Sequence, residues 1–201
     1  MSSQSYVWYS VYGSNLSRQR FLCYIVGGKP TFGKKNYKGC RNKMLPIKDK
    51  PCKISYSLYF ALPEKVEKTD NWGYGGVAFI NPSKKHHEND WTLGRMWKIT
   101  NEQYKEVRCQ EGCNWYNKEI ELGKEDGIPI YTITNKAKLT NIMLPSDAYL
   151  RTMALRLKET YNLTDDKIAG LLLEKSGVKG KLSIEKLIGI ISSASALART
   201  L

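Results

Sequence analysis

The chain has 201 residues and a mass of 23.0 kDa, which is enough for one ordinary domain with a buried core. Its 41% hydrophobic and 25% charged residues match an average globular protein and exclude a disordered, collagen-like or low-complexity chain. Lysines and arginines number 32 against 19 aspartates and glutamates, a net charge of +13 that makes small acids, nucleic acids and membrane surfaces candidate partners.

The cysteines and the termini bear on the compartment. An odd and scattered set of cysteines is typical of free thiols in a reducing environment; the five are Cys23, Cys40, Cys52, Cys109 and Cys113. The first residues lack a basic region followed by an apolar stretch, and Leu187–Ala198 is shorter than the roughly 20 residues of a membrane span. We therefore expect a cytoplasmic protein that crosses no membrane.

The N-terminal segment predicts a strand, a tight turn and a helix. Aromatic and β-branched residues fill Tyr6–Tyr12, and Gly13 ends this strand. Ser14 or Asn15 then caps a helix that stops at Gly27. Unpaired backbone N–H groups and the positive end of the helix would meet at this turn and could bind an anion. The alternative is that Gly13 only permits the turn and Ser14 only caps the helix.

The next segment, Lys29–Lys53, concentrates the positive charge. It holds nine basic residues and one acid, Asp49, hence a net charge of +8. Prolines and glycines interrupt it without a sustained periodicity, which predicts a long surface loop. With Phe32 and Tyr37 interleaved it could contact a nucleic-acid backbone. Nucleic-acid binding is the weaker interpretation, because the chain has no zinc-finger, RNA-recognition or helix-turn-helix signature, and a solubilising loop is favoured.

Five further strand-like runs follow, each bounded by glycine, proline or asparagine. They are Ser55–Leu62, Gly76–Ile80, Leu93–Ile99, Lys118–Leu122 and Ile130–Thr134. With the first strand they predict a sheet of about six strands. After Pro145 the pattern becomes purely helical, with Ser146, Thr164 and Ser183 as starting residues. The fold class is therefore α+β, with a domain over 1–161 and a C-terminal helical extension over 162–201 packed on it.

A helix between two of these strands ends at a carboxylate. Thr100 and Gln103 form a capping box at its start, and it ends near Gln110-Glu111-Gly112. The C-terminal end of a helix disfavours negative charge, and burial near a ligand would raise the Glu111 pKa from about 4.3 towards neutrality. Glu111 is thus a candidate acid/base; the alternative is an ordinary solvated glutamate.

Metal and thiol chemistry are disfavoured. His86 and His87 with Cys109 and Cys113 supply four soft ligands, but adjacent histidines point apart and the two cysteines flank Glu111. A cysteine–histidine nucleophile is also disfavoured, since both histidines lie in a polar loop. We expect no metal site.

The motifs YGSNL at Tyr12–Leu16, Trp72 with GGVA at 75–78, and QEG at 110–112 resemble the gamma-glutamylcyclotransferase-like family in order and spacing. The resemblance covers about Tyr6–Leu157. It implies a small mixed β-barrel with flanking helices and a cavity at one end. The lysine-rich segment and the helices after Thr164 are not explained by this family core. Asn15 after Gly-Ser resembles the branch acting on gamma-glutamyl dipeptides and amines more than the glutathione-specific one.

The resemblance also implies an activity: release of 5-oxoproline and an amine or amino acid from a small gamma-glutamyl substrate, with no cofactor. Glu111 would be the general acid/base. The implied substrate-binding residues are Tyr12, Gly13, Ser14, Asn15, Leu16, Gly75, Gly76, Tyr131 and Tyr149. A homodimer could bury the apolar faces of the last helices. The alternative function is a non-catalytic module that binds an acidic ligand or nucleic acid through the cavity or the lysine-rich segment.

Overall fold

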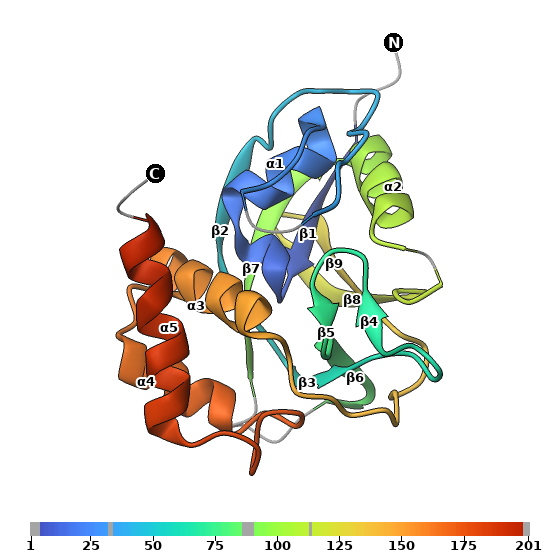
Figure 1. Ribbon diagram of the computed structural model, residues 1–201. Coiled ribbons are helices and arrows are strands. Elements are labelled where there is room, and N and C mark those ends of the chain that lie inside the picture. The colour runs from blue at the N-terminus through green and yellow to red at the C-terminus, as the bar shows by residue number, and fades with distance from the viewer. Residues whose placement is uncertain (1–4, 32–33, 86–90, 113, 199–201) are drawn as a thin grey trace.

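A five-stranded sheet forms the centre of the protein (Figure 1). The computed structural model describes residues 5–31, 34–85, 91–112 and 114–198, with the backbone alone at 84–85 and 194–198. The strand order in the sheet is β2 (Lys48–Ile54), β7 (Thr92–Thr100), β1 (Tyr6–Val11), β9 (Ile128–Thr134) and β8 (Lys118–Glu125). Strands β1 and β9 are parallel, and the other neighbours are antiparallel. Four of the six strands expected from the sequence lie in this sheet, as β1, β7, β8 and β9; the other two are present but form a separate ladder, so the expected single sheet is divided.

Two smaller ladders complete the strands. Strand β3 (Tyr56–Ala61) pairs with β6 (Val77–Lys85), and β4 (Lys68–Thr69) pairs with β5 (Gly73–Tyr74). The hydroxyl of Thr134 in β9 donates a hydrogen bond of 2.7 Å to the Ile80 carbonyl in β6, which joins the β3–β6 ladder to the main sheet. The α+β class is confirmed. Within the described residues the pairings form three separate sheets, so a barrel closed by hydrogen bonds stays a prediction.

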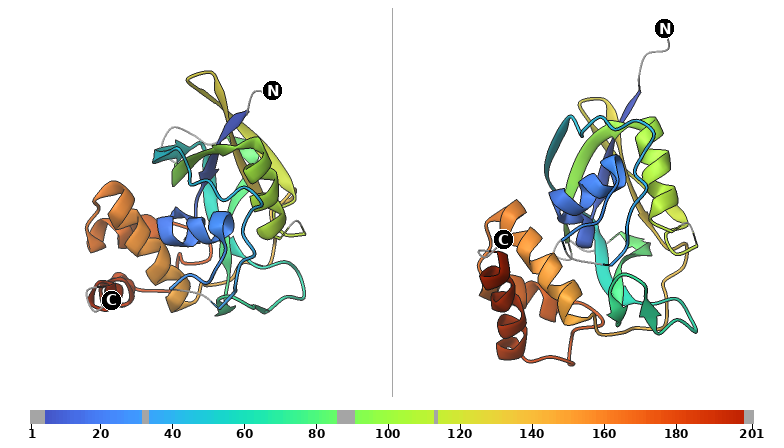
Figure 2. Two further views of the ribbon diagram at one scale, coloured as in Figure 1. Left: turned by 90° about the horizontal axis from the view of Figure 1, so that it is seen from above. Right: turned by 45° about the horizontal axis from the view of Figure 1, so that its top comes forward.

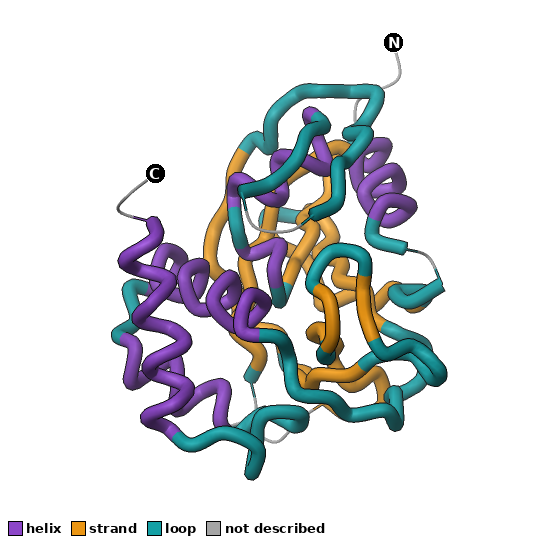
Figure 3. Tube along the Cα trace, in the orientation of Figure 1, coloured by secondary structure: helices purple, strands orange, loops and turns teal. Residues whose placement is uncertain are grey.

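The helices form two groups. Helices α1 (Arg18–Val26) and α2 (Asn101–Gln110) lie beside the main sheet. Helices α3 (Asp147–Tyr161), α4 (Asp165–Leu173) and α5 (Ile184–Ala198) gather on the other side of the molecule, as Figures 2 and 3 show. In the described part of the chain, no helix has both the length and the apolar character that a membrane span requires.

Capping explains where the helices begin. The predicted capping box of Thr100 and Gln103 is present in full, and Ser146 and Thr164 cap α3 and α4 as expected. The start of α1 is different. Residues Ser14–Leu16 form one 3₁₀ turn, and the cap is Ser17, whose hydroxyl accepts a 3.2 Å hydrogen bond from the Arg20 N–H. The expected cap at Ser14 or Asn15 is therefore wrong by two or three residues.

The prediction of one surface loop over Lys29–Lys53 is also wrong in part. Its last residues form β2, the edge strand that pairs with β7. Tyr37 and Cys40 are buried, at 5% and 2% exposure. Phe32 lies outside the described residues. The segment is therefore partly structural, and it also carries an ion pair between Arg41 and Glu106 of α2.

Two hydrophobic cores flank the site. The first joins the main sheet to α1 and α2, where Phe21 stacks on Trp97 with ring centroids 4.6 Å apart. The second joins the β3–β6 ladder to α3, α4 and α5 and includes fully buried Phe60, Ile168 and Leu187. Helices α4 and α5 thus share a core with the preceding residues. The domain boundary at residue 161 stays a prediction.

The shared core makes a prediction about stability. Leu187 in α5 is fully buried, so Leu187→Ala should lower the free energy of unfolding by about 2–5 kcal/mol. Leu171→Ala in α4, where the leucine is 39% exposed, should cost roughly 1 kcal/mol or less. Denaturant unfolding of both variants measures this difference. Equal small losses would show that α5 contributes little to the core.

Candidate active site

Two adjoining cavities lie where β1 ends. The inner cavity has a volume of about 50 Å³ and the outer one about 170 Å³. Both are lined by Ser14, Glu111, Tyr116 and Tyr149, so these four residues stand at the junction. The inner wall is completed by Tyr9, Ser10, Val11, Tyr12, Gly13, Asn15, Ala78 and Ile133. The outer wall is completed by Arg20, Tyr24, Lys35, Tyr37, Thr69, Asp70, Asn71, Trp72, Val77, Gln110 and Trp115.

The turn after β1 brings backbone close to the side chains across the cavity. A Cβ atom at Gly13 would lie 2.9 Å from the Tyr149 hydroxyl and 3.3 Å from the Ala78 Cβ, so space requires glycine here. The Tyr149 hydroxyl accepts a hydrogen bond of 3.0 Å from the Ala78 N–H. The Leu16 N–H donates to the Gly13 carbonyl at 3.1 Å. Leu16 therefore offers no free backbone donor to an anion.

Glu111 is held by donors from three other parts of the chain. Its Oε1 accepts hydrogen bonds from the Asn15 amide and, at 3.4 Å, from the Tyr9 hydroxyl. Its Oε2 accepts from the Tyr24 hydroxyl at 3.0 Å. The Asn15 oxygen in turn accepts a 3.1 Å hydrogen bond from Arg20 Nε, which fixes the orientation of the amide. The carboxylate is therefore fixed by β1, the turn and α1 together.

Each residue of the QEG motif has a distinct structural role. Gln110 donates to the Tyr24 carbonyl of α1 at 2.9 Å and accepts from the Gly39 N–H at 3.1 Å, so it ties the lysine-rich segment to both helices. Glu111 is the last residue of α2 with helical dihedrals. Gly112 has φ +91°, a conformation that glycine adopts readily, and it ends the helix. The motif thus directs one carboxylate into the cavities.

Burial governs the titration of this cluster. It raises the pKa of Glu111 above its usual value of 4.5, while the Arg20 charge and the Tyr24 hydrogen bond act in the opposite direction. Burial and the nearby Glu111 charge raise the pKa of Tyr9 and of Tyr24 well above 10.0. Burial also raises the pKa of Tyr149 to about 12. The phenols therefore remain protonated donors while Glu111 can exchange a proton.

The structure brings together five of the nine substrate-binding residues implied by the resemblance: Tyr12, Gly13, Ser14, Asn15 and Tyr149 line the inner cavity with Glu111. Leu16 is fully buried in the core instead. Tyr131 stacks on Tyr104 and lines neither cavity. Gly75 and Gly76 also lie outside the walls, and a Cβ atom on them would meet the Leu144 and Met143 carbonyls at 2.6 and 2.5 Å. They let the segment before α3 pass beside β6.

Sequence reasoning missed Arg20, Tyr24, Tyr116 and Lys35. Arg20 and Tyr24 are four residues apart and therefore share one face of α1. A charged residue among the apolar positions of that helix was the signal that could have revealed Arg20 and Tyr24. Tyr37 was considered only as part of a nucleic-acid surface, whereas its hydroxyl accepts a 2.6 Å hydrogen bond from Arg20.

Metal-ligating groups do not cluster in the described part of the chain. His86, His87 and Cys113 lie outside the described residues. The four cysteines that are described are all free thiols.

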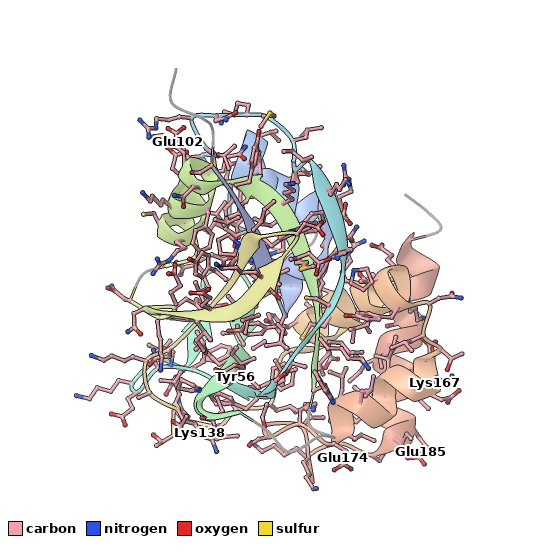
Figure 4. The ribbon with its side chains drawn as sticks, turned by 180° about the vertical axis from the view of Figure 1, so that it is seen from behind. Tyr56, Glu102, Lys138, Lys167, Glu174 and Glu185 are labelled. Carbon is pink, nitrogen blue, oxygen red and sulfur yellow. The ribbon has the colours of Figure 1, made fainter. Side chains whose placement is uncertain are left out.

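Figure 4 shows Glu102, at the start of α2, at the opposite end of the molecule from Glu174 at the end of α4 and Glu185 in α5.

No family model matches the sequence. Histone deacetylase 5 of Arabidopsis thaliana is 32% identical over 199 residues, an alignment that covers 80% of this chain and 29% of that protein. The chain therefore spans less than a third of the length of this curated relative.

Two solved structures resemble the protein over 92% of this chain and 99% of theirs. One is a gamma-glutamyl cyclotransferase, with a TM-score of 0.54 and 21% identity. The other is an uncharacterized protein from Homo sapiens, with a TM-score of 0.55 and 22% identity. The chain is thus an α+β protein with cavities at the end of β1. Its fold is the gamma-glutamyl cyclotransferase fold, which confirms the resemblance of the sequence motifs at the level of the fold.

The raised pKa of Glu111 predicts a pH-dependent stability. The folded protein binds this proton more tightly than the unfolded chain, so stability is lost as pH rises from about 4.5 through the higher folded-state pKa. Glu111→Gln replaces the titrating carboxyl group with a neutral amide. Unfolding free energies of both proteins between about pH 4 and about pH 8 should therefore diverge in favour of the variant as pH rises. A difference that stays constant with pH would contradict the raised pKa.

Proposed function

We propose that the protein is a gamma-glutamyl cyclotransferase that releases 5-oxoproline and an amine from a small gamma-glutamyl substrate. The observation that carries the proposal is the placement of Glu111, a carboxylate with a raised pKa at the junction of two cavities. The fold and the YGSN turn support it. The two cavities together would hold the substrate, with the scissile amide beside Glu111 at their junction.

The nucleophile in this reaction comes from the substrate. Its α-amine attacks its own γ-carbonyl, forms the ring C–N bond and expels the amide nitrogen. Orienting such an intramolecular attack is worth effective molarities of about 10⁵–10⁸ M, so the main task of the site is to fold the glutamyl chain. The turn of residues 13–15 and the wall formed by Tyr12 and Tyr149 would do so. Backbone N–H groups of Gly13 and Asn15 would bind the developing oxyanion.

Glu111 would move the protons. The α-ammonium loses two protons in all, one before attack and one from the ring nitrogen, and the departing nitrogen gains two. As a carboxylate, Glu111 accepts each proton from the attacking nitrogen, and as the acid it delivers each to the leaving nitrogen. Asn15, Tyr9 and Tyr24 would keep its two oxygens oriented between the cavities. The chemistry requires no metal or organic cofactor, because the substrate provides the nucleophile.

Turnover should depend on the Glu111 carboxyl group. Glu111→Gln should keep the fold and lower 5-oxoproline formation by at least about 100-fold, since general acid/base catalysis is typically worth about 10²–10⁴. Mass spectrometry of reactions with a panel of gamma-glutamyl amino acids and amines measures this. Glu121→Gln, which changes an exposed glutamate of β8, is the matched control and should be fully active. Retained activity in Glu111→Gln would refute the proposed mechanism.

The pH profile should respond to the Tyr24 hydroxyl. Its hydrogen bond lowers the pKa of Glu111, so Tyr24→Phe should raise that pKa and move the acidic limb of kcat/KM to higher pH. Loss of a hydrogen bond to a charged group corresponds to a shift of about one pH unit. The control Tyr104→Phe removes a hydroxyl that donates to Glu119 and should leave the limb in place. An unchanged limb in both variants would exclude Glu111 as the titrating base.

A further inference from the structure

A groove lies between α4 and the edge of the main sheet. It has a volume of about 760 Å³ and shares no lining residue with the two cavities of the candidate active site. One wall comes from α4 and the residues beside it, and the other from the end of β2 and the start of β7, where Lys53 pairs with Leu93. We propose that this α4 groove binds an acidic segment of a partner protein that also carries large apolar side chains. The inference does not depend on the proposed function.

Large apolar side chains reach the surface in the α4 groove. Trp91 is 40% exposed and Leu171 is 39% exposed, and half-buried Leu93 and Leu163 lie beside them in the lining. Apolar side chains gathered in one concave surface are typical of a site that another molecule covers. Tryptophan is also among the residues that contribute most to binding between proteins. The floor of the groove therefore favours an occupant with apolar side chains of its own.

Gly170 leaves the α4 groove open. It lies inside α4, where glycine destabilises a helix relative to alanine. A Cβ atom at this position would meet nothing within 4 Å among the described residues beyond its chain neighbours and the helix backbone. Packing of the fold thus does not require glycine here, in contrast to Gly13, Gly75 and Gly76. A groove that must stay free for an occupant explains the glycine.

The charge around the α4 groove is positive. Three lysines line it, Lys53, Lys167 and Lys175. Glu174 is the single acid among the described residues of the lining, and its carboxylate accepts a 3.0 Å hydrogen bond from Lys179, which lies outside the groove. The whole chain also carries a net charge of +13. Charge complementarity therefore favours an acidic occupant and disfavours a second copy of this chain.

The lysines and the apolar side chains lie close together. The Lys53 ammonium is 5.5 Å from the centre of the Trp91 ring, so a carboxylate that binds the ammonium brings its neighbouring side chain to the ring. A nucleic-acid backbone would also satisfy the lysines, but it has no apolar group to cover Leu163 and Leu171. The nine residues of α4 span about 13 Å, which matches about four residues of an extended peptide. A peptide with both acidic and apolar side chains fits all these features.

Selection from a random dodecapeptide library displayed on phage tests the inference. The wild-type protein should enrich peptides that combine acidic residues with large apolar ones. Gly170→Trp places a large side chain in the α4 groove and should not enrich them. The enriched peptides are then synthesised with a fluorophore, and fluorescence anisotropy measures their Kd for each variant. Circular dichroism verifies that each variant is folded.

Matched substitutions assign the binding to the α4 groove. Gly170→Trp should weaken binding by at least about 10-fold, and Lys53→Glu and Lys167→Glu by about 5–10-fold each. The two lysine variants change exposed residues and keep the test available if Gly170→Trp does not fold. Gly170→Ala adds only a methyl group and should keep the wild-type Kd while it raises the Tm. Lys138→Glu reverses a charge on the opposite side of the molecule from Lys167 (Figure 4) and should change the Kd by less than about 2-fold.

The other outcomes overturn the inference. They are an absence of enrichment, enrichment of neutral or basic peptides, and equal enrichment by wild type and Gly170→Trp. An effect of Lys138→Glu as large as that of Lys167→Glu would show that the net charge, and not the groove, attracts the peptide. A fluorescent single-stranded RNA that binds more tightly than the best peptide and is lost in Gly170→Trp would assign the groove to nucleic acid. A dimer seen in sedimentation and abolished by Gly170→Trp would assign it to a second copy.

Discussion

The rest of the site depends on a carboxylate held at the C-terminal end of a helix. A negative charge at that end of α2 is unfavourable by itself, and burial adds to the cost. Donors from Asn15, Tyr9 and Tyr24 offset it. Each donor lies on a different stretch of the chain, so β1, the turn after it and α1 must be fixed relative to α2 before Glu111 is correctly placed.

Close packing of backbone explains the glycines of the motifs. Gly13 lets the turn approach the Tyr149 hydroxyl, and Gly75 and Gly76 let the segment before α3 cross β6. The two hydrophobic cores meet at the turn after β1, where Val11 belongs to one core and Tyr12 and Tyr149 belong to the other. The cavities therefore lie where the cores meet, and their walls come from both.

The sequence predicted those features that depend on local signals. The capping box of Thr100 and the end of α2 at Glu111 follow from neighbouring residues, and both are present. Strand β2 was missed because Pro51 and several lysines occupy it, a composition that an edge strand tolerates. The partners of Glu111 could not be predicted, because hydrogen bonds between residues far apart in the chain leave no periodic signal. Arg20 was overlooked although its spacing of four from Tyr24 places it on the buried face of α1.

These long separations also bear on how the protein folds. The three side chains that donate hydrogen bonds to Glu111, those of Tyr24, Asn15 and Tyr9, are 87, 96 and 102 positions away in the sequence. Contacts of such high contact order form late, because closing each loop costs entropy before the contact stabilises it. The lysine-rich segment must also be in place, because its Gly39 donates a hydrogen bond to Gln110 and its Tyr37 accepts one from Arg20. Partly folded chains therefore lack the hydrogen-bonded cluster around Glu111, which exists only once both cores have formed.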